Sequence, residues 1–129
     1  MLVAATVLMA IVVLVHEFRA RTASFGSISP GEAVRMLNSG ALLIDIRTSE
    51  AFAAAHIANA RSVPGATIAD GAAALERFKE KPVVVYCDSG QTAGAAARHL
   101  GRLGFKQVSN LRGGLSAWRA ENLPVEKKG

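Results

Sequence analysis

The sequence predicts an α/β fold in which an open parallel sheet is covered by helices on both faces. Short apolar runs at residues 41–46, 81–86 and 105–111 alternate with segments of helical character. The first two runs are almost continuously apolar, which is typical of strands buried on both faces. Strands that alternate with helices form parallel sheets joined by crossover helices. We expect an open sheet of five strands, preceded by one N-terminal hydrophobic helix.

The chain of 129 residues is long enough for one domain and a short extra segment. Residues 1–15 contain no charged side chain. A helix needs about 20 apolar residues to cross a bilayer upright, so this run is short, and Phe18 and local thinning of the bilayer would help it to span. We expect a membrane anchor with its basic flank at residues 1–21, a linker at residues 22–26 and the folded domain at residues 27–129.

Two other interpretations of the N-terminal run stay open: a cleaved signal peptide and a helix buried in the domain. A signal peptide would carry a basic residue before the run and small residues before the cut, and the sequence shows neither. Arg19 and Arg21 follow the run, and no basic residue precedes it. The positive-inside rule therefore predicts a single pass through the inner (cell) membrane by residues 1–18, with the domain in the cytoplasm.

The charge pattern and the cysteine count narrow the class of function. The formal net charge is +5, but the charges are scattered and are not interleaved with aromatic residues, so we expect no nucleic-acid partner. The positive excess suits a solvated surface near an anionic leaflet or the attraction of a small anionic substrate. Cys87 is the only cysteine, which rules out an internal disulfide and agrees with a reducing compartment.

The first helix of the domain has clear signals at both ends. Ser29 is a candidate N-cap, Pro30 suits the first helical position, and Glu32 completes a capping box. Gly40 is a natural stop. The buried run that follows contains Asp45 near its end.

The remaining elements follow from local patterns. Leu75 and Phe78 share one face of a predicted helix, and Pro64 and Gly104 are expected to end elements. In chain order we expect a short helix and turn at residues 48–60, a brief strand at 61–64, helices at 70–80, 91–104 and 113–122, and a tail at 123–129.

Cys87 directly follows the buried run 81–86, at the carboxyl end of a strand, where α/β sheets collect ligands. Gly90 lets successive backbone N–H groups of the next loop form an anion-binding nest. Thr92, or Gln91 before it, opens a helix whose free N–H groups point back at the loop. Together with Ser89, these donors would stabilise a thiolate. The alternative at this point is a buried structural cysteine that acts as a small hydrophobe.

Three motifs resemble the rhodanese homology domain, in that family's order and spacing, over about residues 27–125. They are "LLIDIRTSEAFAAAHIANARSVP", "VVVYCDSGQTA" and "VSNLRGGLSAWRAENLPV". The resemblance implies a sulfurtransferase in which Cys87 takes sulfane sulfur from thiosulfate or a persulfide donor, carries it as a persulfide and passes it to a thiol acceptor, small or on a protein. The loop amides of Asp88, Ser89, Gly90, Gln91 and Thr92 would hold the persulfide. No metal and no organic cofactor is implied.

The other motif residues are expected to support the fold. Asp45 and Arg47 match the family's strand-end pair, and we expect Asp45 to brace the catalytic loop and Arg47 to pair with Glu50. His56 fits a structural histidine better than an acid–base group, because a thiolate held by amides needs no partner base. Trp118 is assigned to the core. A Gly-Gly pair at residues 113 and 114 is expected to allow a tight turn.

The loop departs from the family pattern at Asp88 and Thr92, where many active rhodaneses carry a basic residue. A negative Asp88 would repel thiosulfate and raise the pKa of Cys87. This departure favours an alternative, a non-catalytic, membrane-tethered binding module with the same fold. A Cys-loop phosphatase is disfavoured, because Thr92 and Ala93 stand where that chemistry needs an arginine clamp.

Overall fold

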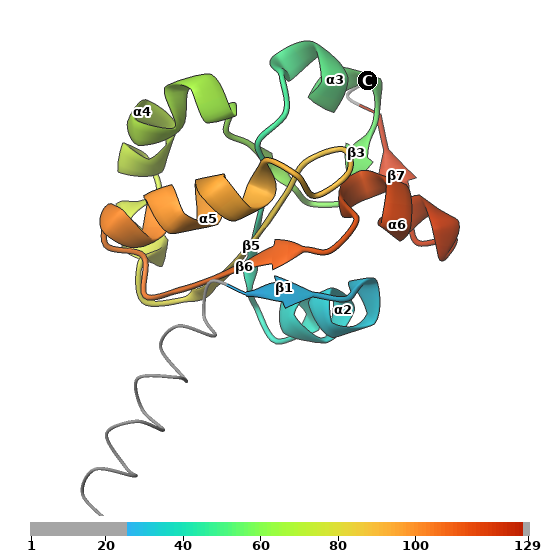
Figure 1. Cartoon of the computed structure of the whole chain (residues 1–129), viewed down its shortest axis with the longest axis horizontal. Helices are drawn as coiled ribbons and strands as arrows, with labels where there is room; N and C mark the ends of the chain where they lie inside the picture. The colour runs from blue at the N-terminus through green and yellow to red at the C-terminus, as the bar shows by residue number, and fades with distance from the viewer. Residues whose placement is uncertain (1–25, 128–129) are drawn as a thin grey trace, which may run out of the picture.

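A computed structural model describes residues 26–127 (Figure 1). Five parallel strands form one sheet in the order β1-β6-β5-β2-β4, which confirms the predicted sheet. The expected anchor and nearly all of the expected linker lie outside the described residues, so the predicted domain boundaries stay predictions. The strands are β1 (Ser27–Ile28), β2 (Leu42–Asp45), β4 (Arg61–Ser62), β5 (Pro82–Tyr86) and β6 (Gln107–Leu111).

Helices cover both faces of this sheet, as predicted. Buried residues of α4 and α5 pack on one face, and those of α2 and α6 pack on the other. In Figure 1, α4 and α5 lie above the sheet and α2 lies below it. The helices are α2 (Pro30–Asn38), α3 (Ser49–Ala54), α4 (Ile68–Ala73), α5 (Ala93–Arg102) and α6 (Gly114–Ala120), with 3-10 turns η1 (Gly65–Thr67) and η2 (Glu76–Phe78).

The central strands are buried on both sides because their apolar side chains alternate between two cores. Val83 and Val85 of β5 face the α4–α5 core, while Val84 and Tyr86 face the α2–α6 core. All four side chains are fully buried. The continuous apolar run is therefore explained by two half-sets of core residues on one strand.

The predicted capping box of α2 is confirmed. The Ser29 hydroxyl accepts from the Glu32 backbone N–H at 3.2 Å, and the Glu32 carboxylate accepts from the Ser29 N–H at 3.4 Å. Gly40 has φ +99°, a conformation that favours glycine, directly after the helix.

The predicted helix at residues 70–80 is wrong in its continuity. α4 ends at Ala73, and the chain continues through the 3-10 turn η2. Leu75 and Phe78 donate their N–H groups to carbonyls three residues back, at 2.9 Å in each case. These tighter turns bring Leu75, 4% exposed, into the core before β5 begins.

A small antiparallel ladder was not predicted. β3 (His56–Ile57) pairs with β7 (Val125–Glu126), so part of the expected tail is ordered. Trp118, 3% exposed, fixes this end of the chain by donating its indole N–H to the Pro124 carbonyl at 2.9 Å. Trp118 is thus a core residue, as expected.

Within residues 26–127, none of the helices combines the length and the apolar character needed to span a bilayer. The predicted membrane segment at residues 1–18 lies outside this part of the chain.

The carboxyl ends of β2 and β5 lie next to each other. The parallel register pairs Asp45 with Tyr86, so the residues that follow, Ile46 and Cys87, start from the same edge of the sheet. This pairing brings the Asp45–Arg47 segment to the loop that carries Cys87.

Candidate active site

Cys87 lies at the carboxyl end of β5, and its side chain packs with the α4–α5 core. The residue is 5% exposed. Its sulfur accepts a hydrogen bond from the backbone N–H of Gly90 at 2.9 Å. Gly90 has φ +90°, so a glycine here allows the loop to turn its amide back onto the sulfur.

The surroundings of Cys87 favour the thiolate. Burial of the sulfur raises the pKa of the Cys87 thiol, but hydrogen bonds from the Thr92 hydroxyl and from the backbone amides of Thr92, Ala93 and Gly90 outweigh it. The net pKa is therefore lowered from that of an ordinary thiol. Thr92 and Ala93 are the N-cap and first residue of α5, whose N–H groups have no partner within the helix.

The predicted loop residues differ in whether they interact with the Cys87 sulfur. Gly90 and Thr92 act on the sulfur. Ser89 and Gln91 are exposed, and no side-chain hydrogen bond is recorded for either among the described residues. The Ala93 amide was missed, although its place at the start of a predicted helix was a usable signal.

Arg47 is the centre of a hydrogen-bonded cluster beside the loop. Its Nε lies 3.1 Å from both carboxylate oxygens of Asp45, and its Nη2 lies 2.7 Å from Oδ2. Nη2 also donates to the Ala55 carbonyl at 2.5 Å, and Nη1 donates to Asp88 Oδ1 at 3.1 Å. The Asp45 side chain is fully buried and that of Arg47 is 8% exposed. A buried ion pair of this kind is tolerated because every charged group has partners.

Two expectations about this cluster are corrected. Arg47 pairs with Asp45 and Asp88 rather than with Glu50, because the guanidinium is buried at the strand edge while Glu50 is exposed in the first turn of α3. Asp45 does not contact the loop side chains directly. It holds Arg47, and Arg47 reaches Asp88.

The charge of Asp88 is offset in part by Arg47. The pair with Arg47 sets a positive group against a carboxylate whose side chain is 73% exposed. The pKa of Cys87 is lowered, which is opposite to the direction expected from Asp88 alone. Arg47 is shared between two carboxylates, those of Asp45 and Asp88, so one formal negative charge remains and the predicted negative character of the loop is only partly offset.

The Gly113–Gly114 pair does more than allow a turn. Gly114 has φ +56°, and a Cβ there would collide with the Cys87 carbonyl oxygen and lie 2.8 Å from the Asp88 carbonyl carbon. This close approach lets Leu115 N–H donate to Cys87 O at 2.9 Å and Ser116 N–H donate to Asp88 O at 3.0 Å. These two hydrogen bonds from the start of α6 thus fix the backbone of Cys87 and Asp88.

His56 and Tyr86 have structural contacts. His56 stacks on Phe52 with ring centroids 3.8 Å apart, and its two ring nitrogens contact the Phe52 carbonyl at 2.8 Å and the Glu126 carboxylate at 3.3 Å. Both nitrogens are occupied, in agreement with a structural histidine. The hydroxyl of Tyr86, a residue that sequence reasoning missed, accepts from Ile57 N–H at 3.0 Å. Burial, followed by hydrogen bonding with Asp45, raises the pKa of Tyr86.

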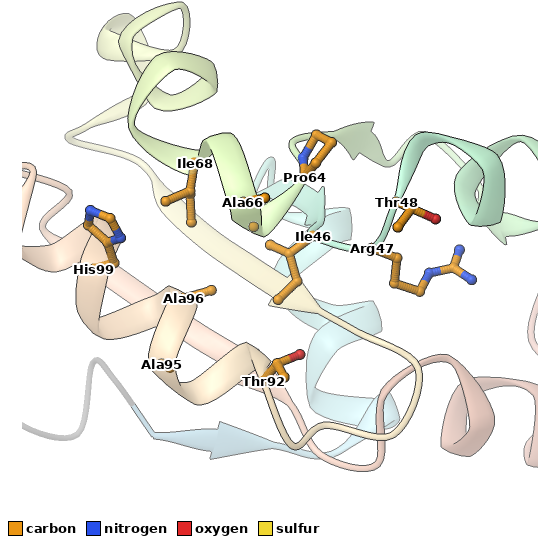
Figure 2. A pocket seen from close by; sticks show the side chains of 11 residues that line it. Ile46, Arg47, Thr48, Pro64, Ala66, Ile68, Thr92, Ala95, Ala96 and His99 are labelled. Atoms are coloured by element: carbon orange, nitrogen blue, oxygen red, sulfur yellow. The ribbon is translucent and has the colours of Figure 1, made fainter.

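A cavity of about 410 Å³ lies between α5 and the segments 46–48 and 64–68 (Figure 2). Thr92 joins the two sites, because it lines the cavity and its hydroxyl acts on the sulfur. Figure 2 shows Arg47 and Thr48 at one end and His99 at the other. The wall between them is apolar and consists mainly of Ile46, Pro64, Ala66, Ile68, Ala95 and Ala96. The space therefore suits a molecule with a carbon skeleton better than a bare inorganic anion.

In the part of the chain that the structure describes, no group of three or more His, Cys, Asp or Glu side chains is arranged to hold a metal ion.

Known proteins are similar in sequence to this chain. The model of the rhodanese-like domain matches residues 29–121. YibN of Escherichia coli (strain K12) is 36% identical over 117 residues, which cover 89% of this chain and 82% of YibN. The thiosulfate sulfurtransferase GlpE of Pseudomonas aeruginosa (strain LESB58) is 34% identical over 97 residues, which cover 75% of this chain and 86% of GlpE.

A solved structure shares the fold. The polysulfide-sulfur transferase homodimer of Wolinella succinogenes superimposes with a TM-score of 0.69 at 27% identity, covering 90% of this chain and 88% of that one. The family match, the GlpE relative and the Cys87 loop at the end of β5 agree with one another. The chain belongs to the rhodanese-like domain family, among whose members are sulfurtransferases.

Proposed function

We propose that this protein is a sulfurtransferase in which Cys87 carries sulfane sulfur as a persulfide. The observation that carries the proposal is the position of the Cys87 sulfur, 2.9 Å from the Gly90 amide and before the start of α5, where hydrogen bonding with Thr92, Ala93 and Gly90 lowers the pKa of the thiol. The names of GlpE and of the Wolinella protein support sulfur as the transferred group. A structural cysteine needs no such donors.

The transfer requires no oxidant. The Cys87 thiolate attacks the outer sulfur of the donor, the donor's S–S bond breaks, and the leaving group (sulfite from thiosulfate, or a thiolate from an organic persulfide) departs with the electron pair. An acceptor thiolate then attacks the terminal sulfur and Cys87 leaves as the thiolate. The donors around the sulfur stabilise the negative charge before loading, in the persulfide and after release.

The geometry favours an organic persulfide over thiosulfate as the donor. The apolar cavity beside Thr92 offers room for a carbon skeleton. Asp45 and Asp88 together outweigh Arg47, the cation that would otherwise attract a dianion, since their carboxylates lie 2.7 and 3.1 Å from its guanidinium. We therefore expect glutathione persulfide to load Cys87 faster than thiosulfate at equal concentration.

The intact mass of the protein tests the proposal. After exposure to glutathione persulfide, polysulfide or thiosulfate, we expect one added sulfur atom on the wild-type chain and none on Cys87→Ser. A thiol acceptor should remove the added mass. An unchanged mass after all three donors would refute the proposal.

The alternative, a non-catalytic binding module, depended on the negative charge of Asp88. Arg47 offsets that charge only in part, because it also pairs with Asp45, and it is the lowered pKa of Cys87 that argues against the alternative. The alternative predicts that partners captured by the wild-type chain are also captured by Cys87→Ala.

We also propose that residues 1–18 anchor the domain in the cell membrane by a single pass, with the domain in the cytoplasm. The proposal is supported by the uncharged run 1–15 and by Arg19 and Arg21 after it. It predicts that the chain stays with the membrane fraction after alkaline carbonate extraction. Full release into the supernatant would contradict it.

A further inference from the structure

The edge of the sheet opposite Cys87 is strongly basic. In a parallel sheet all strands start at one edge and finish at the other. Arg61 is the first residue of β4, and Lys81 and Lys106 directly precede β5 and β6. All three are exposed. Cys87 follows the end of β5, so the basic side chains and the catalytic loop lie at opposite ends of the strands.

Three of the cations surround one aromatic ring. The Arg61 Cζ, Arg77 Cζ and Lys81 Nζ atoms lie 5.0, 4.8 and 5.8 Å from the centroid of Phe78. The ring face attracts each cation, which offsets part of their mutual repulsion. The result is a concentrated positive patch with a half-buried aromatic side chain in its middle.

Few acidic groups compensate this patch. Among residues 26–127, Glu76 pairs with Lys79 at 3.2 Å, and no ion pair is recorded for the three cations around Phe78. Glu80 is exposed nearby in sequence. We call the group Arg61, Arg77, Lys79, Lys81 and Lys106 the basic edge.

The chain enters the domain from the side of the basic edge. β1 runs parallel to β6, and the Gly26 carbonyl accepts from Asn110 N–H at 3.1 Å. A strand that points toward the catalytic edge is approached from the opposite edge. The uncharged run 1–15, with Arg19 and Arg21, precedes β1 in the sequence by only a few residues.

We propose that the basic edge docks on an anionic phospholipid surface, which orients the domain with Cys87 facing away from the bilayer. Stable membrane attachment commonly combines a hydrophobic signal with a basic patch, and the uncharged run 1–15 would supply the first of these. The inference goes beyond the sulfurtransferase activity and does not depend on it. It does rest on the proposed attachment of residues 1–18 to the membrane.

Site-specific labelling of the full chain tests this orientation. In a Cys87→Ser background, Gln107→Cys places a thiol beside Lys106 at the basic edge, and Ser116→Cys places one beside the catalytic loop. Both positions are exposed. The protein is mixed with phosphatidylcholine vesicles, with and without phosphatidylglycerol, and treated with a membrane-impermeant maleimide. We expect Gln107→Cys to react several-fold more slowly on anionic than on neutral vesicles, with the difference lost at high salt, while Ser116→Cys reacts equally on both.

Two triple variants with the same loss of charge distinguish the effect of the basic edge from the effect of the protein's net charge. Arg61→Gln, Arg77→Gln and Lys81→Gln together should abolish the protection of Gln107→Cys. Removal of the same number of charges elsewhere, at Arg98, Arg119 and Lys127, should preserve it. Equal labelling of Gln107→Cys on both vesicle types would overturn the proposal, as would failure of the full chain to float with anionic vesicles. Binding to a nucleic-acid duplex that depends on the three residues, without vesicle protection, would assign the edge to a different partner and also overturn it.

Discussion

Removal of the Thr92 hydroxyl should raise the pKa of Cys87. A hydrogen bond to a charged group contributes about 1.5–3 kcal/mol, and one pKa unit corresponds to about 1.4 kcal/mol. Thr92 is exposed, which places its contribution at the low end of this range. In Thr92→Val the three amide donors remain, so the thiol keeps part of its lowered pKa.

The rate of alkylation by iodoacetamide as a function of pH measures this change. The thiolate is the nucleophile, so the rate rises as pH rises through the pKa of Cys87. The midpoint for the wild type should lie below that of an ordinary thiol, and the midpoint for Thr92→Val should lie above that of the wild type. Because the folded-state pKa is lowered, the same hydrogen bonds stabilise the fold above the ordinary thiol pKa, and this stability is lost as pH falls through the folded-state value.

The design separates electrostatics from helix capping. The Thr92 side chain makes no capping hydrogen bond to α5, so its loss should leave the helix intact. Thr92→Ser should restore the wild-type midpoint. Thr67→Val, at an exposed N-cap that also lacks a side-chain bond, is a matched control. An unchanged or lowered midpoint in Thr92→Val would refute the reasoning about the sulfur's donors.

Three further predictions concern the supports of the site. Arg47→Gln leaves the buried Asp45 without its charge partner, and the free energy of unfolding in urea should fall by about 3–5 kcal/mol. Gly114→Ala forces a Cβ against the Cys87 carbonyl at φ +56°, so thermal stability should fall and alkylation of Cys87 should slow. Ala95→Leu projects into the cavity from the exposed side of α5, so the KM for glutathione persulfide should rise several-fold while that for thiosulfate changes little.

Matched controls accompany these variants. Arg98→Gln removes an exposed arginine with no recorded ion pair among the described residues and should change unfolding by less than about 0.5 kcal/mol. Gly31→Ala adds a Cβ in ordinary contact with Ser29 and should be neutral or stabilising. Ala120→Leu adds the same bulk as Ala95→Leu at an exposed site outside the cavity. If Ala95→Leu and Ala120→Leu changed the KM for glutathione persulfide equally, the cavity would not determine the preference for this donor.

Local signals in the sequence were sufficient for the main elements. The Ser29 capping box, the apolar runs and the glycines after the helices each act within a few residues, and the structure reproduces them. The position of Cys87 at a strand end followed from the same signals. Among the two-residue strands, β4 was predicted within residues 61–64, whereas β1, β3 and β7 were not, because they are too short to show alternation.

Contacts between distant segments were the part that the sequence could not show. Arg47 meets Asp88 only because β2 lies next to β5 in the sheet, and nothing in the sequence near Arg47 states that order. Glu50 lies three residues from Arg47 and Asp88 lies 41 residues from it, yet Asp88 is the residue that pairs with Arg47. Likewise, a glycine is needed at position 114 because its backbone packs against the Cys87 carbonyl, a contact that a local sequence pattern cannot reveal.

The depth of Cys87 has a consequence for selectivity among reactive partners. At 5% exposure, Cys87 is shielded from the disulfides of other proteins. A persulfide adds a second sulfur atom about 2 Å further out. If Cys87 is loaded as we propose, only the persulfide form extends far enough for a large thiol to reach the outer sulfur. No second cysteine in the chain competes for that sulfur. The accessibility of the terminal sulfur, and not intrinsic nucleophilicity alone, would then make the persulfide form react with large thiols while the free thiolate does not.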